Sequence, residues 1–353
     1  MKYWRYKNTL QIILLSCFLF LLTGCKDEYI SFHSKELQIA NKPEIKTKSG
    51  YFLIENIKEK KYELVSTPNP NWLEKILNLI TWAKKRLYVE VYILSEKRII
   101  DAIIEAKKRW VDTKVILEQW VYWAWNTNKK VFDKLKSNAV EVVYANKKNY
   151  NFTHAKYIIV DDNYIISSGN FSHSTFVSNV DHLLIWNIKS ELETLLDVFD
   201  NDMKWIYKEY CQQDLIISPK CPRIALEQII SWAKSSIDIF SEAIWDEKLE
   251  NLLIKKSKEN VKVRLVVGDF NKIKSNMKLL NLFKSYPISI IAPKKPYIHT
   301  KVIIIDSKIL YVWSINLTTN SMENNREIWT IFKNNEIVRV LENEFLTLFS
   351  KQQ

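Results

Sequence analysis

The chain has 353 residues, of which 47% are hydrophobic, and it carries a formal net charge of +12. This length and apolar content exclude a largely disordered chain and allow two domains, or two halves of one large domain, each with its own core. The positive charge favours an anionic partner, and nucleic acid and an anionic lipid surface fit it equally well; solubility alone is the other explanation.

The first 24 residues have the pattern of a secretory signal peptide. Cationic residues precede an apolar run over residues 12–22, which is short for a membrane span but fits the hydrophobic region of a signal. The ending Leu22-Thr23-Gly24-Cys25 resembles a bacterial lipobox, in which Cys25 becomes the lipidated first residue. We expect a signal peptide at 1–24, a tether at 25–50, and a lipoprotein exported to the outer face of the cytoplasmic membrane or the cell surface. An uncleaved N-terminal anchor is the alternative.

Helix and strand patterns alternate in the first half of the chain. A helix is predicted after Asn71, because asparagine is a preferred N-cap residue and apolar residues follow at helical spacing. Residues 87–94 are typical of a strand, residues 99–109 of a helix and residues 113–119 of a strand. The predicted order is therefore α, β, α, β.

The second half repeats this order. A helix and a strand are predicted within 225–244, then a helix near 246–258 and a strand at 261–267, and Trp82-Ala83-Lys84 reappears as Trp232-Ala233-Lys234. A repeat of about 150 residues is too long for a solenoid and suits two α/β lobes. The expected segments are lobe 1 at 51–210, a linker at 211–222 and lobe 2 at 223–353.

Two cysteines, Cys211 and Cys221, bracket the expected linker. In an exported protein, oxidising conditions permit a disulfide between them, and their spacing does not suggest a metal site. Two unpaired thiols are the alternative.

One short motif occurs twice, as HAKYIIVD at 154–161 and HTKVIIID at 299–306, in a chain with five histidines. Side chains alternate along a strand, so His154 and Lys156 project together, as do His299 and Lys301. Imidazole beside ammonium suits a phosphate group. The apolar residues after each Lys predict central strands buried between helices.

The aspartates that end the motifs, Asp161 and Asp306, lie an odd number of residues from His and Lys, so we interpret them as structural. Polar residues that can donate hydrogen bonds to a phosphoryl oxygen follow each motif. These are Ser168 and Asn170 in the first half and Ser314 and Asn316 in the second. Farther on, Asp181 and Glu327 are candidates to hold one ring nitrogen of each histidine.

The paired motifs resemble those of the phospholipase D superfamily, over about residues 51–350. The resemblance implies an α/β fold of two similar lobes, each a mixed sheet flanked by helices, packed with pseudo-two-fold symmetry. Both motifs would then meet at one site in a monomer, with no metal and no cofactor.

The resemblance also implies roles for the site residues. One histidine attacks phosphorus to form a phosphohistidine, and the other protonates the leaving oxygen and then activates water or an alcohol. Lys156, Lys301, Asn170 and Asn316 would bind the non-bridging oxygens, and Asp181 and Glu327 would orient the histidines. By analogy, His154 is the nucleophile and His299 the acid and base.

Three functions are consistent with this sequence. The first is a lipoprotein phosphodiesterase that acts on phospholipid head groups, by hydrolysis or by transfer to an alcohol as in cardiolipin synthesis; its partner is an anionic phospholipid or membrane surface. The second is a secreted endonuclease of the same superfamily, with nucleic acid as its partner. The third is an inactive relic that binds lipid or nucleic acid.

The chain has four glycines and 13 tryptophans, against a typical glycine content of ~7%. Tryptophan also stands where relatives have small residues, most clearly just before Ser314. We hypothesise that some tryptophans are glycines in the organism, because its genetic code reads UGA as glycine. The candidates are Trp110, Trp123, Trp125, Trp313 and Trp329. If Trp313 is genuine, an indole crowds the phosphate site, which favours the inactive relic.

Overall fold

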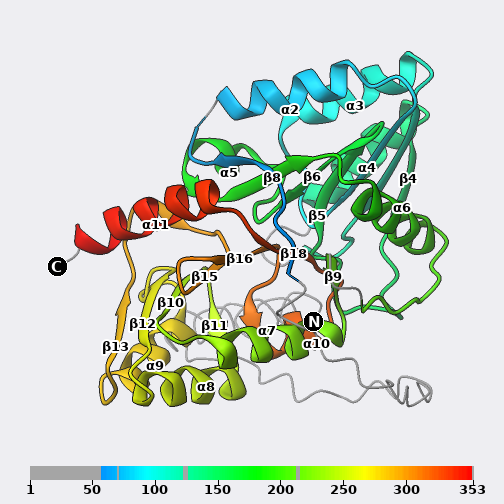
Figure 1. The fold of residues 1–353 in the computed structure, drawn as a ribbon. Coiled ribbons are helices and arrows are strands. Elements are labelled where there is room, and N and C mark those ends of the chain that lie inside the picture. Colours follow the sequence, from blue (N-terminus) through cyan, green and yellow to red (C-terminus); the bar gives the residue numbers. More distant parts are fainter. Residues whose placement is uncertain (1–56, 70, 122–125, 212–214, 352–353) are drawn as a thin grey trace, which may run out of the picture. The chain divides into compact units, whose positions relative to one another are not determined.

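The computed structural model describes residues 57–69, 71–121, 126–211 and 215–351, without the side chain of Trp313 (Figure 1). The predicted signal peptide, Cys25 and the tether therefore lie outside the described residues. None of the helices that are described is long and apolar enough to cross a membrane. All the described residues belong to one compact unit.

The core of this unit contains two seven-stranded mixed sheets. In spatial order the first sheet consists of β1 (Glu63–Ser66), β8 (His182–Trp186), β6 (Asn163–Ser167), β5 (Lys156–Val160), β2 (Arg86–Val91), β3 (Asp112–Leu117) and β4 (Glu141–Tyr144). The second consists of β9 (Leu215–Ile217), β18 (Ile328–Lys333), β16 (Ile309–Trp313), β15 (Val302–Ile305), β10 (Ser236–Ser241), β12 (Lys262–Val267) and β13 (Ile288–Ile291).

The two sheets match strand for strand. In the first, β2 runs parallel to β3 and antiparallel to β5; in the second, β10 runs parallel to β12 and antiparallel to β15. The apolar strands β5 and β15 are buried and lie at the centre of their sheets, as their sequences predict. The predicted fold of two similar α/β lobes is confirmed.

Helices cover both outer faces. Three helices pack on the first sheet: α2 (Asn71–Thr81), α3 (Lys97–Lys108) and α4 (Thr127–Ser137). Three pack on the second: α7 (Cys221–Trp232), α8 (Glu247–Lys258) and α9 (Lys274–Phe283). The predicted helices and strands of both halves are thus present, with ends that differ by a few residues.

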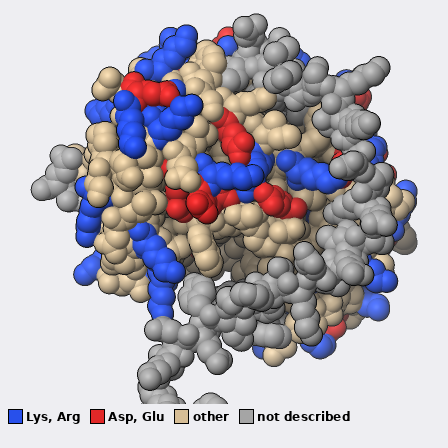
Figure 2. All heavy atoms as spheres, turned by 90° about the horizontal axis from the view of Figure 1, so that it is seen from below, with Lys and Arg blue, Asp and Glu red and all other residues tan. Residues whose placement is uncertain are grey.

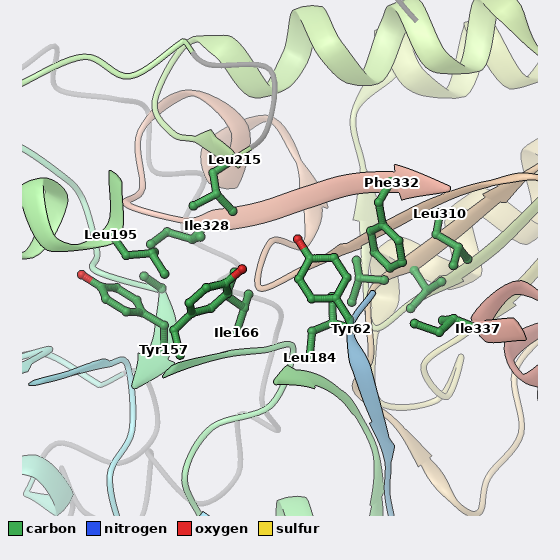
Figure 3. Close-up of a cluster of buried hydrophobic side chains, with 14 of the residues drawn as sticks. Tyr62, Tyr157, Ile166, Leu184, Leu195, Leu215, Leu310, Ile328, Phe332 and Ile337 are labelled. Carbon is green, nitrogen blue, oxygen red and sulfur yellow. The ribbon is translucent and has the colours of Figure 1, made fainter. Parts of the chain in front are cut away.

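A third apolar cluster joins the inner faces of the two sheets. It contains residues of both sheets together with α6 (Lys189–Met203) and α11 (Asn335–Ser350). Figure 3 shows part of it, with Tyr157 and Ile166 of the first sheet near Ile328 of the second. Burial of this shared apolar surface stabilises the association of the lobes, so the two repeats form one structural unit. The remaining helices, α5 (His173–Val177) and α10 (Thr319–Glu323), and the short strands β7 (Asn179–Val180), β11 (Ile244–Trp245), β14 (Tyr297–Ile298) and β17 (Leu317–Thr318) lie in the connections.

Part of the segment predicted as a linker, 211–222, forms regular structure. Strand β9 pairs with β18 at the edge of the second sheet, and α7 begins at Cys221. Cys211 and Cys221 are joined by a disulfide, with their Cα atoms 5.5 Å apart. Residues 215–217 therefore belong to the second lobe, because these apolar residues complete the edge of its sheet.

Asp161 and Asp306 lie in the turns after β5 and β15, both with a φ of 53°. Asp161 accepts hydrogen bonds of 2.7–3.0 Å from the backbone N–H groups of residues 84–86. Asp306 accepts equivalent bonds of 2.7–3.1 Å from residues 234–236. Each aspartate thus connects the turn after its strand to the start of β2 or β10, where the repeated Trp-Ala-Lys sequence ends.

Trp110 has a backbone conformation that favours glycine. It follows α3 with a φ of 69° and is 94% exposed; its counterpart after α8 is Asn260, with a φ of 64°. Glycine and asparagine are the usual residues at this position after a helix, so the geometry supports the recoding hypothesis at Trp110. Trp329, by contrast, is buried against Tyr311, and Trp123 and Trp125 lie outside the described residues.

Candidate active site

His154 lies on the segment that leads into β5, and a carboxylate of the other lobe holds it. Its Nδ1 lies 2.9 Å from both carboxylate oxygens of Glu327, which precedes β18. The backbone N–H of His154 also donates to the carbonyl oxygen of Arg326, at 2.8 Å. A carboxylate can only accept, so Nδ1 carries a proton, and in the neutral ring Nε2 keeps its lone pair.

His299, in the second lobe, is held in the same way by a carboxylate of the first lobe. Its Nδ1 lies 2.8 and 3.1 Å from the two carboxylate oxygens of Asp181 in lobe 1. Its backbone N–H donates to the carbonyl oxygen of Val180, at 3.1 Å. Each half-site therefore combines a histidine of one lobe with a carboxylate of the other, and the site requires both lobes.

Ser168 and Ser314, predicted to bind phosphate, each donate a hydrogen bond to the carboxylate that holds a histidine. The Ser168 hydroxyl donates to Asp181, at 2.7 Å, and the Ser314 hydroxyl donates to Glu327, also at 2.7 Å. A hydroxyl carries a single proton, and each serine donates it to the carboxylate. The predicted role of Ser168 and Ser314 toward a phosphoryl oxygen stays a prediction.

The motif lysines are almost completely buried. The Nζ of Lys156 donates to the carbonyl oxygen of His154, at 2.7 Å, and the Nζ of Lys301 donates to that of His299. Lys301 Nζ also lies 3.5 Å from the carbonyl oxygen of Ser168, across the lobe boundary. Burial lowers the pKa of Lys156 to about 7, against the attraction of Glu327, so an arriving anion restores its positive charge.

Burial also determines the protonation state of His154. It lowers the pKa of His154 to about 4, although Glu327 acts in the opposite direction. Burial opposes the ionisation of Glu327 and Asp181, yet the facing histidines hold the pKa of each carboxyl below its usual value. At neutral pH, His154 is therefore a neutral imidazole beside an ionised carboxylate.

The two asparagines follow β6 and β16 and form hydrogen bonds with residues just after β2 and β10. Asn170 accepts with Oδ1 from the backbone N–H of Ile93, at 3.2 Å, which leaves its amide N–H₂ group as the donor. Asn316 donates with Nδ2 to Glu242, at 3.3 Å. Both asparagines therefore lie beside the half-site of their own lobe, where a phosphoryl oxygen would need donors.

Sequence reasoning missed Glu242, which directly follows β10. Its Oε2 lies 3.7 Å from His299 Nε2 and 3.6 Å from Lys301 Nζ, and its Oε1 accepts from the Tyr297 hydroxyl, at 2.6 Å. Although burial opposes its ionisation, His299 and Lys301 lower the pKa of Glu242 to about 2. Alignment of the two repeats could have identified this residue, because the corresponding position in lobe 1 is Tyr92.

The other two histidines in the described chain lie outside this constellation. His182 is buried between Thr300 and Glu344, with its ring nitrogens 2.6 and 2.8 Å from their oxygens. His173 is exposed near Glu96. Neither takes part in a half-site.

Surface charge is mixed on the face that Figure 2 shows, where Asp and Glu side chains lie among Lys and Arg side chains. Among the described residues, exposed charges also form ion pairs, for example Lys97 with Asp101 and Lys134 with Asp101. A polyanion would therefore meet both signs of charge on this face.

Comparison with known proteins gives two kinds of match. The family model described as cardiolipin synthase, PLD-like domain matches twice, at residues 76–203 and 226–349. Mitochondrial cardiolipin hydrolase of Homo sapiens is 31% identical over 114 residues, which are 32% of this chain and 45% of that protein. The chain thus matches less than half the length of this curated relative.

Solved structures show the same fold at low identity. Phosphatidylserine synthase of Haemophilus influenzae aligns with a TM-score of 0.64 at 12% identity, over 82% of this chain and 87% of that one. Polyphosphate kinase of Porphyromonas gingivalis aligns with a TM-score of 0.61 at 14% identity, over 80% of this chain and 49% of that one. These similarities concern the fold alone.

Proposed function

Because the chain belongs to the family of cardiolipin synthase PLD-like domains, within the phospholipase D superfamily, we propose that it is a phosphodiesterase acting on phospholipid head groups. The observation that carries this proposal is the crossed pair of half-sites, in which His154 is held by Glu327 and His299 by Asp181. Two histidines in two different environments suit a reaction that needs one nucleophile and one proton donor.

In the first step, the Nε2 lone pair of His154 attacks phosphorus. A P–N bond forms, the bond from phosphorus to the leaving oxygen breaks, and the Nε2 proton of His299 passes to that oxygen. Glu327 stabilises the positive charge that develops on His154. Lys156 and Lys301, with the amides of Asn170 and Asn316, neutralise and bind the non-bridging oxygens.

In the second step, His299 takes a proton from water or from an alcohol as that oxygen attacks phosphorus. The P–N bond breaks, and His154 returns to its neutral form. Water gives hydrolysis, and a lipid alcohol gives phosphatidyl transfer. The same site serves both outcomes, because only the acceptor differs.

A phospholipid substrate is supported by the family and by the relative named cardiolipin hydrolase. A lipid anchor at Cys25 would place the enzyme body beside its substrate at the outer face of the cytoplasmic membrane or the cell surface.

The test is a direct comparison of substrates. Purified protein is incubated with labelled phosphatidylglycerol, labelled phosphatidylcholine and supercoiled plasmid DNA, with His154→Ala as the control. We expect release or transfer of the phosphatidylglycerol head group by the wild-type chain and none by the variant. Cleavage of plasmid DNA alone would contradict the proposal and support an endonuclease.

A further inference from the structure

The two half-sites differ at the position that follows β2 in the first lobe and β10 in the second. Tyr92 follows β2 and Glu242 follows β10, and the strands correspond because Val91 pairs with Leu117 and Ser241 with Val267. The ring centroids of Tyr92 and His154 are 4.8 Å apart. Glu242 instead brings a carboxylate within 3.7 Å of His299 Nε2. Both histidines have an aromatic neighbour, since the Tyr297 and His299 ring centroids are 6.3 Å apart, but His299 also faces the Glu242 carboxylate.

Two hydrogen bonds and a nearby ammonium group hold the Glu242 carboxylate beside His299. The Tyr297 hydroxyl donates to Oε1, at 2.6 Å, and Asn316 Nδ2 donates to Oε2, at 3.3 Å. Lys301 Nζ lies 3.6 Å from Oε2. The side chain is 18% exposed, so solvent reaches it only in part, and its charge acts strongly on its neighbours.

His299 consequently lies between two carboxylates. Asp181 binds Nδ1, and Glu242 lies on the Nε2 side. An imidazolium has a proton on each ring nitrogen, and a carboxylate lies on the side of each nitrogen of His299. Among the described residues, the carboxylate in contact with His154 is Glu327, which lies on the Nδ1 side.

We propose that Glu242 is a positioning residue that orients His299 and stabilises a proton on its Nε2, and so makes His299 the acid and His154 the nucleophile. This inference rests on the proposed function, and it explains why one histidine is the acid and the other the nucleophile. In the first step, the proton that Glu242 stabilises on Nε2 passes to the leaving oxygen as its bond to phosphorus breaks. The carboxylate itself gains no proton in that step.

The test compares two leaving groups in Glu242→Gln. An alkoxide, as in phosphatidylglycerol in detergent micelles, needs a proton to leave, whereas the p-nitrophenolate of bis(p-nitrophenyl) phosphate does not. General acid catalysis contributes ~10²–10⁴-fold to rate, so we expect kcat/KM to fall at least about tenfold for the lipid. We expect less than about a threefold fall for the aryl ester.

Glu247→Gln is the matched control, because it removes the same charge from an exposed position in the first turn of α8. It should leave both substrates unaffected, and Glu242→Asp should recover part of the loss. An equal loss on both substrates in Glu242→Gln, or no loss on either, would overturn the role of Glu242 while the proposed function stands. A wild-type chain that cleaves neither substrate would overturn the proposed function, and the role of Glu242 with it.

Discussion

Replacement of Glu327 by Gln should disable the nucleophile while leaving its surroundings nearly unchanged in shape. Both oxygens of Glu327 lie 2.9 Å from His154 Nδ1, and the carboxylate also accepts from the Ser314 hydroxyl. Gln keeps the length of the side chain, but one oxygen becomes a donor. An N–H donor facing Nδ1 favours the tautomer with the proton on Nε2, which removes the lone pair needed for attack.

The size of the effect follows from two contributions. A hydrogen bond to a charged group is worth ~1.5–3 kcal/mol, and its loss removes stabilisation of the positive His154 ring as the P–N bond forms. The unfavourable tautomer adds to this, and the comparable Asp-to-Asn change in serine protease triads lowers kcat by about 10⁴-fold. We expect kcat/KM of Glu327→Gln to fall by about 10³–10⁴-fold.

The assay is hydrolysis of bis(p-nitrophenyl) phosphate, with thermal unfolding followed in parallel. Glu344→Gln is the matched control, because Glu344 also binds a ring nitrogen of a buried histidine, His182 at 2.8 Å, but outside the half-sites. It should lower the rate by less than about tenfold. Activity of Glu327→Gln within tenfold of wild type would refute the role given to Glu327.

Four further predictions concern the catalytic pair, pH, the tryptophans and the anchor. His154→Ala and His299→Ala should each abolish turnover of phosphatidylglycerol, and the double variant should lose no more than either, because residues that act as one unit are not additive; substantial turnover by either single variant contradicts this. The kcat/KM profile should fall below pH 4, as His154 gains a proton, and above pH 7, as Lys156 loses its charge; activity rising steadily from pH 7 to 9 would oppose it. Peptides from the organism should have glycine's mass at position 110, where φ is 69°, and tryptophan's mass there would refute recoding at that position. In recombinant protein that carries tryptophan, Trp110→Gly should raise the free energy of unfolding by about 1 kcal/mol. Glycine in place of Trp313 should raise activity. Radiolabelled fatty acid should be incorporated into the chain and lost in Cys25→Ser, and labelling that persists would exclude Cys25 as its site.

Much of the fold follows from local sequence patterns. The apolar runs of β5 and β15 and the helical spacing in α2 and α3 are local signals, and the internal repeat gives the number of lobes. Strand β9, within the segment predicted as a linker, has no such local signal. Its three residues gain their structure by pairing with β18. That pairing depends on tertiary contacts rather than on the sequence of β9.

The site shows a similar division. The histidines, lysines and carboxylates are recognisable by type and spacing, but the crossed pairing of His154 with Glu327 and His299 with Asp181 is a property of how the lobes associate. Ser168 and Ser314 suggested phosphate donors, although their short distances to the carboxylates give them another partner. Glu242 belongs to no motif, and its importance appears only once the repeats are superposed strand by strand.

The most direct test of the account is to trap the covalent intermediate. His299→Ala is mixed with excess bis(p-nitrophenyl) phosphate, quenched in alkali to preserve phosphohistidine, digested and examined by mass spectrometry. Since p-nitrophenolate leaves without an acid but the second step needs a base, the account predicts that a phosphoryl adduct accumulates on His154. An adduct on another residue, or p-nitrophenol release by wild type with no adduct in the variant, would contradict the two-histidine mechanism.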